Sequence, residues 1–119
     1  MPEARTFKGS CHCGAVAYEV TTGLEKVISC NCSRCSRLGW LISFVPPDDF
    51  RLLSGEEVLA EYRFNTHNIA HLFCRQCGIE SFARGRNREG AAMIAVNVRC
   101  LDGVDLASLE ITEVDGRSR

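Results

Sequence analysis

Cysteines are the residues of this sequence whose type and spacing point most directly to chemistry. The chain has 119 residues, and eight of them are cysteine. Seven stand in three short groups: Cys11 and Cys13; Cys30, Cys32 and Cys35; Cys74 and Cys77. The eighth, Cys100, stands alone, and we interpret it as a buried free thiol that packs like a small hydrophobic residue. The chemistry of this sequence therefore depends on what the three groups bind or catalyse.

The close spacing favours metal binding over disulfides. A tetrahedral zinc site holds thiolates about 2.3 Å from the ion, and a C-x-x-C turn can place two sulfurs on one ion. Residues 74–78 form such a turn and residues 11–14 a tighter C-x-C-G version. Residues 1–8 lack the apolar core of a signal peptide. We therefore expect a cytoplasmic protein, in a compartment where stable disulfides are rare.

A redox-active C-x-x-C pair is the weaker alternative. Such a pair usually lies between a strand and a helix, and no helix is predicted after Cys77.

The number of cysteines indicates how they divide between sites. Two pairs complete one closed structural zinc site, which Cys11, Cys13, Cys74 and Cys77 can form. The remaining group supplies three thiolates, and three protein ligands with one open position are typical of catalytic zinc. Two alternatives stay open at this point. Cys100 or a histidine can complete the second site and make it structural too, or the groups can pair differently.

The rest of the sequence predicts an all-β protein. Val16, Tyr18 and Val20 alternate with other residues, which predicts one buried strand face. Strands 51–53 and 58–64 are expected to pair across a turn at Ser54 and Gly55. A single helical turn is expected at 32–37, a hairpin tip at 65–68 and a polar loop at 85–90. The other expected strands cover 5–9, 14–20, 27–30, 40–45, 69–73, 79–83 and 93–98.

Length and charge limit the function classes. The chain is the size of one domain, which we assign to residues 1–119. Fourteen basic and fifteen acidic residues give a net charge of -1, so no overall field attracts nucleic acid or an anionic membrane. The longest apolar stretch, 39–47, is too short to cross a bilayer. We interpret Arg84, Arg86 and Arg88 as solvated residues of a polar loop rather than a phosphate site.

Several side chains near the cysteines are further candidates. Arg34 and Arg37 can pair with a substrate carboxylate, although the favoured interpretation is solvated arginines. His67 and His71 are expected on one strand face, as proton donors or, preferably, as structural residues.

Other residues near the cysteines are expected to be structural. His12 is expected to point away from the metal. Trp40, Phe44 and Phe50 can line a pocket, but a core role is favoured.

Three segments in this order resemble the glutathione-dependent formaldehyde-activating enzyme family: Gly9-Ser10-Cys11-His12-Cys13-Gly14, Cys30-Asn31-Cys32-Ser33-Arg34-Cys35 and Phe73-Cys74-Arg75-Gln76-Cys77-Gly78. Asn97-Val98-Arg99-Cys100-Leu101-Asp102 resembles a segment common near the end of its members. The resemblance covers roughly residues 5–110. It implies a β-tent fold of stacked antiparallel sheets with zinc knuckles.

The resemblance also implies two zinc ions per chain. Cys11, Cys13, Cys74 and Cys77 would hold the structural ion, and Cys30, Cys32 and Cys35 a catalytic one with an open position. In the family's namesake activity, glutathione and formaldehyde give S-hydroxymethylglutathione, so a carbon–sulfur lyase with a small thiol and an aldehyde as partners is implied. The namesake enzyme is longer, which makes the zinc chemistry more transferable than the thiol. The alternative is a non-catalytic zinc-binding interaction module with the same fold.

Overall fold

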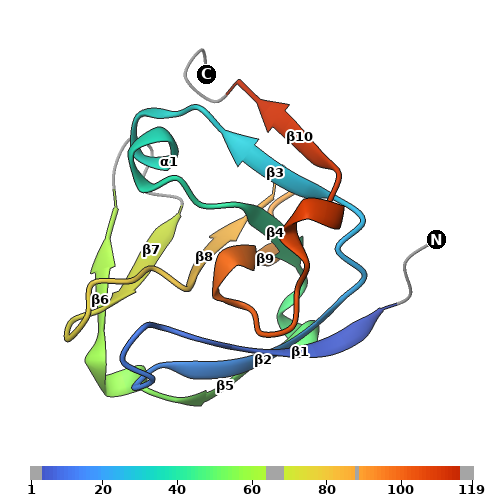
Figure 1. Ribbon diagram of the computed structural model, residues 1–119. Helices are drawn as coiled ribbons and strands as arrows, with labels where there is room; N and C mark the ends of the chain where they lie inside the picture. The colour runs from blue at the N-terminus through green and yellow to red at the C-terminus, as the bar shows by residue number, and fades with distance from the viewer. Residues whose placement is uncertain (1–3, 64–68, 88, 116–119) are drawn as a thin grey trace.

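Two β-sheets form the framework of the protein. The structure is a computed structural model that describes residues 4–63, 69–87 and 89–115 (Figure 1). One sheet has the order β1-β2-β5 and consists of β1 (Arg5–Ser10), β2 (Ala17–Thr22) and β5 (Phe50–Ser54). The other has the order β10-β3-β4-β9-β8-β7-β6 and consists of β3 (Val27–Cys30), β4 (Ile42–Val45), β6 (Leu59–Tyr62), β7 (Ala70–Cys74), β8 (Phe82–Arg86), β9 (Ala92–Asn97) and β10 (Ile111–Val114). The all-β prediction is confirmed.

Helical structure in the described part of the chain is short. The helix α1 (Ser33–Leu38) is where the sequence predicted a helical turn. Four 3-10 turns connect strands: η1 (Pro47–Asp49), η2 (Glu56–Val58), η3 (Val98–Cys100) and η4 (Leu106–Ser108). No helix among the described residues has the length and apolar character needed to span a membrane.

The main core lies between the two sheets. Val16, Tyr18 and Val20 are all buried, as their alternation predicted, and they pack in one cluster with Phe82 and Val96 of the larger sheet. The rings of Tyr18 and Phe82 meet edge to face with centroids 5.7 Å apart. Aromatic pairs in this geometry contribute beyond their buried area. This core holds β1 and β2, and with them the first cysteine turn, against the larger sheet.

The opposite face of the larger sheet is also covered. Successive side chains on a strand point to opposite faces. Phe82 and Val96 therefore face the smaller sheet, whereas Ala83 and Ala95 pack on the other side with Cys35 of α1. The small size of the two alanines leaves room for the helix. The sheet thus carries α1 on the face away from the main core.

The predicted pairing of segments 51–53 and 58–64 is wrong. The strand β5 pairs with β2 in the smaller sheet, and β6 pairs with β7 in the larger one. Between them Gly55 has φ +95°, and a Cβ built on it would lie 2.4 Å from the carbonyl oxygen of Ala15. Only glycine fits such a contact in the left-handed region. The chain therefore crosses from one sheet to the other where a hairpin was expected.

Three further elements differ from the prediction. The strand β8 begins at Phe82 instead of 79, because residues 79–81 lead out of the second cysteine turn, where the Cys74 N–H donates to the Ile79 carbonyl at 3.0 Å. Arg84 and Arg86 consequently lie in β8 and not in a loop. The strand β10 pairs parallel to β3, so the larger sheet is not wholly antiparallel. The expected hairpin tip 65–68, His67 and Arg88 lie outside the described residues.

Candidate metal centres

Four cysteines from two distant parts of the chain meet at one point. Cys11 and Cys13 follow β1, while Cys74 ends β7 and Cys77 follows it, and their Sγ atoms all lie within 4.8 Å of one another. Cys13 Sγ is 3.6 Å from the Sγ atoms of both Cys11 and Cys74. Sulfurs at about 2.3 Å from a tetrahedral zinc ion lie about 3.8 Å apart. The donor atoms and their spacing therefore fit a zinc ion.

The two cysteine turns have similar backbone geometry. Gly14 and Gly78 both have φ +82°, the left-handed conformation that glycine adopts without strain. The Gly78 N–H donates to the Cys74 carbonyl at 2.8 Å, and the Val16 N–H donates to Cys11 Sγ at 3.4 Å. The backbone hydrogen bond to Cys11 Sγ stabilises the thiolate form of that side chain. Each turn thus brings its two sulfurs to one side.

The thiols of this group influence each other's ionisation. The backbone N–H of Ala15 lowers the pKa of Cys13, but desolvation and the sulfurs of Cys11, Cys74 and Cys77 outweigh it and raise that pKa to about 11. Desolvation raises the pKa of Cys77, yet hydrogen bonds from the backbone and from neighbouring thiols outweigh it and lower that pKa to about 6. Thiolates this close repel each other unless a cation lies between them. The electrostatics favour a bound dication.

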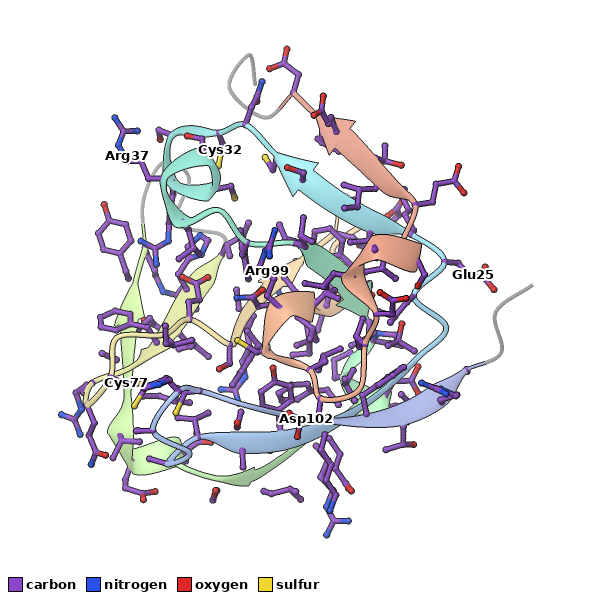
Figure 2. All side chains as sticks on the ribbon, viewed as in Figure 1. Glu25, Cys32, Arg37, Cys77, Arg99 and Asp102 are labelled. Carbon is purple, nitrogen blue, oxygen red and sulfur yellow. The ribbon has the colours of Figure 1, made fainter. Side chains whose placement is uncertain are left out.

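Three other cysteines gather where β3 leads into α1. Cys30 ends β3, Cys32 caps α1 and Cys35 lies in its first turn, and their Sγ atoms lie within 4.8 Å of one another. The Cys35 N–H donates to Cys32 Sγ at 3.3 Å. The Cys32 side chain thus caps the N-terminus of α1, the helix in which Cys35 lies. Figure 2 shows Cys32 beside α1 and Cys77 beside the connection after β7, well apart. The two groups are therefore separate sites.

No fourth ligand joins this second group among the described residues, because neither a further cysteine or histidine nor a carboxylate there has a donor atom within reach of all three sulfurs. Cys100 lies elsewhere and is half-buried. The alternative in which Cys100 completes the second site is therefore not the arrangement of the structure. Three thiols without a fourth protein ligand suit a zinc ion that exposes one position.

Burial in the second group disfavours the negatively charged thiolate forms of Cys32 and Cys35. Desolvation raises the pKa of Cys35 to about 12, and the nearby Trp40 side chain lowers that pKa without outweighing the effect of burial. Desolvation also raises the pKa of Cys32, but the backbone N–H of Cys35 and other hydrogen bonds lower it overall. A metal ion would hold all three as thiolates.

A cavity of about 490 Å³ opens next to this second group. Cys30 and Cys35 form part of its wall, together with Arg99 of η3 and Glu113 of β10. Figure 2 shows Arg99 in the region between α1 and the C-terminal segment. The thiols are therefore accessible to a small molecule.

Comparison with known proteins identifies the family of this chain. The sequence pattern of the family described as glutathione-dependent formaldehyde-activating enzyme matches residues 6–112. The chain belongs to this family. A solved structure of a Rhodobacter sphaeroides protein is similar to it, with 37% sequence identity over 90% of this chain and 99% of that one, and a TM-score of 0.79. The formaldehyde-activating resemblance of the three cysteine segments is thus confirmed.

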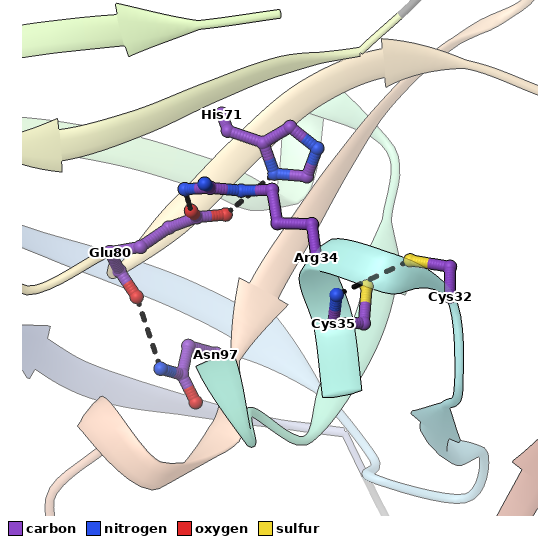
Figure 3. Close-up of polar contacts among 6 residues, drawn as sticks. All are labelled: Cys32, Arg34, Cys35, His71, Glu80 and Asn97. Carbon is purple, nitrogen blue, oxygen red and sulfur yellow. Dashed lines mark hydrogen bonds and ion pairs between the residues drawn. The ribbon is translucent and has the colours of Figure 1, made fainter. Parts of the chain in front are cut away.

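Glu80 is a buried residue next to the second group that the sequence analysis did not single out. Its side chain is 1% exposed, and its two carboxylate oxygens contact the Arg34 guanidinium and, at 2.9 Å, His71 Nδ1. The Glu80 carbonyl accepts a hydrogen bond from Asn97 Nδ2 at 3.0 Å (Figure 3). The only signal in the sequence was a carboxylate among apolar residues three positions after Cys77. Glu80 fixes α1, and with it Cys35, to β7 and β9.

Two of the residues that Glu80 contacts were candidates in the sequence. Arg34 has an internal carboxylate partner, which neither sequence interpretation anticipated, and its guanidinium also lies 4.8 Å from the Tyr62 ring centroid. His71 is buried, and its hydrogen bond with Glu80 agrees with the structural interpretation. Arg37 is exposed and donates to the Ser33 carbonyl at 2.8 Å. His12 is exposed beside the first group.

The three aromatic candidates, Trp40, Phe44 and Phe50, lie in different surroundings. Trp40 is buried in the cluster that contains Cys35, and Phe50 packs on the main core against Tyr18 with ring centroids 5.1 Å apart. The core prediction for Phe44 is wrong, since this side chain is 48% exposed. Phe44 lies in β4, whose outer face at that position is not covered by α1.

Replacement of Glu80 by glutamine is expected to lower the free energy of unfolding by about 2–3 kcal/mol, because Arg34 and His71 lose a buried carboxylate. The value lies below that of a fully buried pair since the Arg34 side chain is 24% exposed. Urea denaturation measures it. The matched control is Glu61→Gln, which removes the exposed ion pair with Arg63 and should leave stability unchanged. Equal effects of both substitutions would contradict the role assigned to Glu80.

Proposed function

We propose that the protein is a zinc-dependent enzyme of the carbon–sulfur lyase type. It joins a small thiol of the glutathione kind to an aldehyde such as formaldehyde, or releases the thiol in the reverse direction. The single observation that carries this proposal is a group of three thiols, without a fourth described ligand, two of which line an open cavity. The family to which the chain belongs carries glutathione and formaldehyde in its name.

In this proposal, Cys30, Cys32 and Cys35 hold a catalytic zinc ion. Zinc in such a site lowers the pKa of a thiol that binds at the open position and so supplies a thiolate at neutral pH. The chain's own residues orient the reactants. α1 and β3 hold the three sulfurs on one side, Glu80 and Arg34 fix the helix, and the cavity brings the aldehyde to the thiol by proximity.

Cys11, Cys13, Cys74 and Cys77 hold a structural zinc ion in the same proposal. All four positions would be filled by protein, so this ion has no place for a substrate. It joins the turn after β1 to the turn after β7, and thus links the two sheets. A reducing compartment such as the cytoplasm would keep all seven ligand thiols from forming disulfides.

Metal content and thiol binding test the proposal together. We expect two zinc ions per purified chain. After replacement of zinc by Co²⁺, glutathione should change the sulfur-to-cobalt absorption of one of the two ions and raise the melting temperature. NMR with labelled formaldehyde should show faster exchange into the thiol adduct with the protein than without it. S-Methylglutathione, which has no free thiol, is the matched control ligand and should do none of this.

The outcome that would contradict catalysis is specific. A chain with two metal ions whose absorption no free thiol changes, and which does not accelerate adduct formation, would be a non-catalytic zinc-binding module.

A further inference from the structure

The cavity beside Cys30 and Cys35 carries charges that the proposed zinc chemistry does not use. Its volume of about 490 Å³ is in the usual range for small-molecule sites. Its lining comes from four segments: Ser29, Cys30 and Asn31; Cys35, Ser36, Gly39 and Leu41; Arg99; Glu113, Val114 and Asp115. One cationic and two anionic side chains thus share a small space with two of the three thiols.

Arg99 is held in place through its backbone while its guanidinium remains exposed. It lies in η3, where its N–H donates to Asn97 Oδ1 at 3.1 Å, and Asn97 in turn donates to the Glu80 carbonyl. The Arg99 guanidinium forms no ion pair with any residue that the structure describes. A guanidinium on a firmly held turn presents a fork of donors that matches a carboxylate.

Glu113 is positioned by the parallel pairing of β10 with β3. It lies opposite Ser29, which lines the same cavity, and the next residue, Val114, lies opposite Cys30. The pairing extends beyond the strand, because the Asn31 N–H donates to the Val114 carbonyl at 3.1 Å. Like Arg99, Glu113 has no ion pair within the described part of the chain. Its carboxylate is therefore available to a ligand cation at the edge of the thiol group.

A second cavity, on the other side of α1, lacks this combination. It is lined by Ser33, Arg34, Arg37, Leu38 and Tyr62, and none of these described residues is a cysteine or carries a carboxylate. Its Arg34 is already paired with Glu80. Of these two cavities, the one beside Cys30 and Cys35 is therefore the one whose described lining combines thiols with side chains of both charges.

We propose that this cavity recognises the charged groups of the thiol substrate, with Arg99 binding a carboxylate and Glu113 an ammonium group. The substrate class is then an amino-acid or short-peptide thiol that carries both charges. This inference rests on the proposed function, since it presupposes that a thiol binds at Cys30, Cys32 and Cys35. It adds which residues select that thiol and which of its charged groups each residue binds.

A matched set of four thiols tests the proposal. Cysteine has both charges, N-acetylcysteine only the carboxylate, cysteine methyl ester only the ammonium, and N-acetylcysteine methyl ester neither. Calorimetry on the zinc-loaded protein should give the tightest binding for cysteine and the weakest for the neutral ester. Metal analysis after each titration shows that the zinc remains bound.

Two variants then assign each charge to its residue. Arg99→Gln should weaken cysteine and N-acetylcysteine roughly tenfold, as the loss of one charge-assisted hydrogen bond does, and leave the methyl ester unchanged. Glu113→Gln should weaken cysteine and its methyl ester and leave N-acetylcysteine unchanged. Arg51→Gln and Glu57→Gln, exposed residues outside the cavity, are the controls and should change none of the four affinities.

Two negative results are distinguishable. Equal binding of all four thiols, unchanged in both variants, would overturn the charge-reading cavity while thiol binding at the zinc stands. No binding of any thiol to the zinc-loaded protein would overturn the proposed function and this inference with it.

Discussion

Replacement of Cys74 by serine is expected to remove most of the protein's stability. Cys74 is fully buried at the end of β7 and packs in the main core. It is one of four sulfurs that would bind one ion, so its loss opens a closed site. In zinc-finger peptides the binding of a structural zinc ion supplies about 10–16 kcal/mol, and that energy is folding energy. We therefore expect a loss on the order of 5 kcal/mol or more, comparable to the whole stability of a small domain.

Thermal unfolding followed by circular dichroism, with zinc content measured on the same samples, checks this prediction. Cys100→Ser makes the same chemical change outside both cysteine groups and is the control, with an expected effect of about 1 kcal/mol. A Cys74→Ser protein that melts within a few degrees of the unchanged chain would show that the first group is not a structural metal site.

Replacement of Cys35 by serine is expected to separate activity from folding. Cys35 supplies one of only three sulfurs in the second group, and its loss should release that metal ion and abolish the proposed activity. The fold should remain, because Glu80 still ties α1 to the sheet and the Cys32 cap is a separate interaction. The expected cost in stability is about 1–2 kcal/mol, from placing a hydroxyl where a buried sulfur packs against Trp40.

The measurements are metal stoichiometry, melting temperature and thiol-dependent adduct formation. One zinc ion per chain, a melting temperature near that of the Cys100→Ser control and no acceleration are the expected results. Full activity with an authentic thiol in the Cys35→Ser protein would refute the mechanism.

The spacing of the cysteines was enough to predict which sequence neighbours lie together. Two residues that are close in sequence and separated by a turn must lie close in space, so C-x-C and C-x-x-C already indicate shared ligands. The joining of Cys11 to Cys74 is a different matter, because no local rule connects residues so far apart. There the order of motifs and the family resemblance supplied what spacing alone left open.

Other features depended on contacts that the sequence does not display. Segments 51–53 and 58–64 look like a hairpin, and only the close approach of Gly55 to Ala15 shows that the chain changes sheets there. Glu80 looks like an ordinary surface carboxylate until Arg34 and His71 are placed around it. In each case the contact that decides the structure involves a residue far away along the chain, so local sequence propensities do not reveal it.

The link between the two cysteine groups has a further consequence for how the chain can vary. The stretch from Cys74 to Glu80 begins with a cysteine of one group and ends with the carboxylate that contacts the helix of the other. Its length is therefore fixed by geometry at both ends. Exchange of the exposed Gln76 should be tolerated, but an inserted or deleted residue would rotate Glu80 away from Arg34. Natural length variation should thus spare this stretch and accumulate elsewhere.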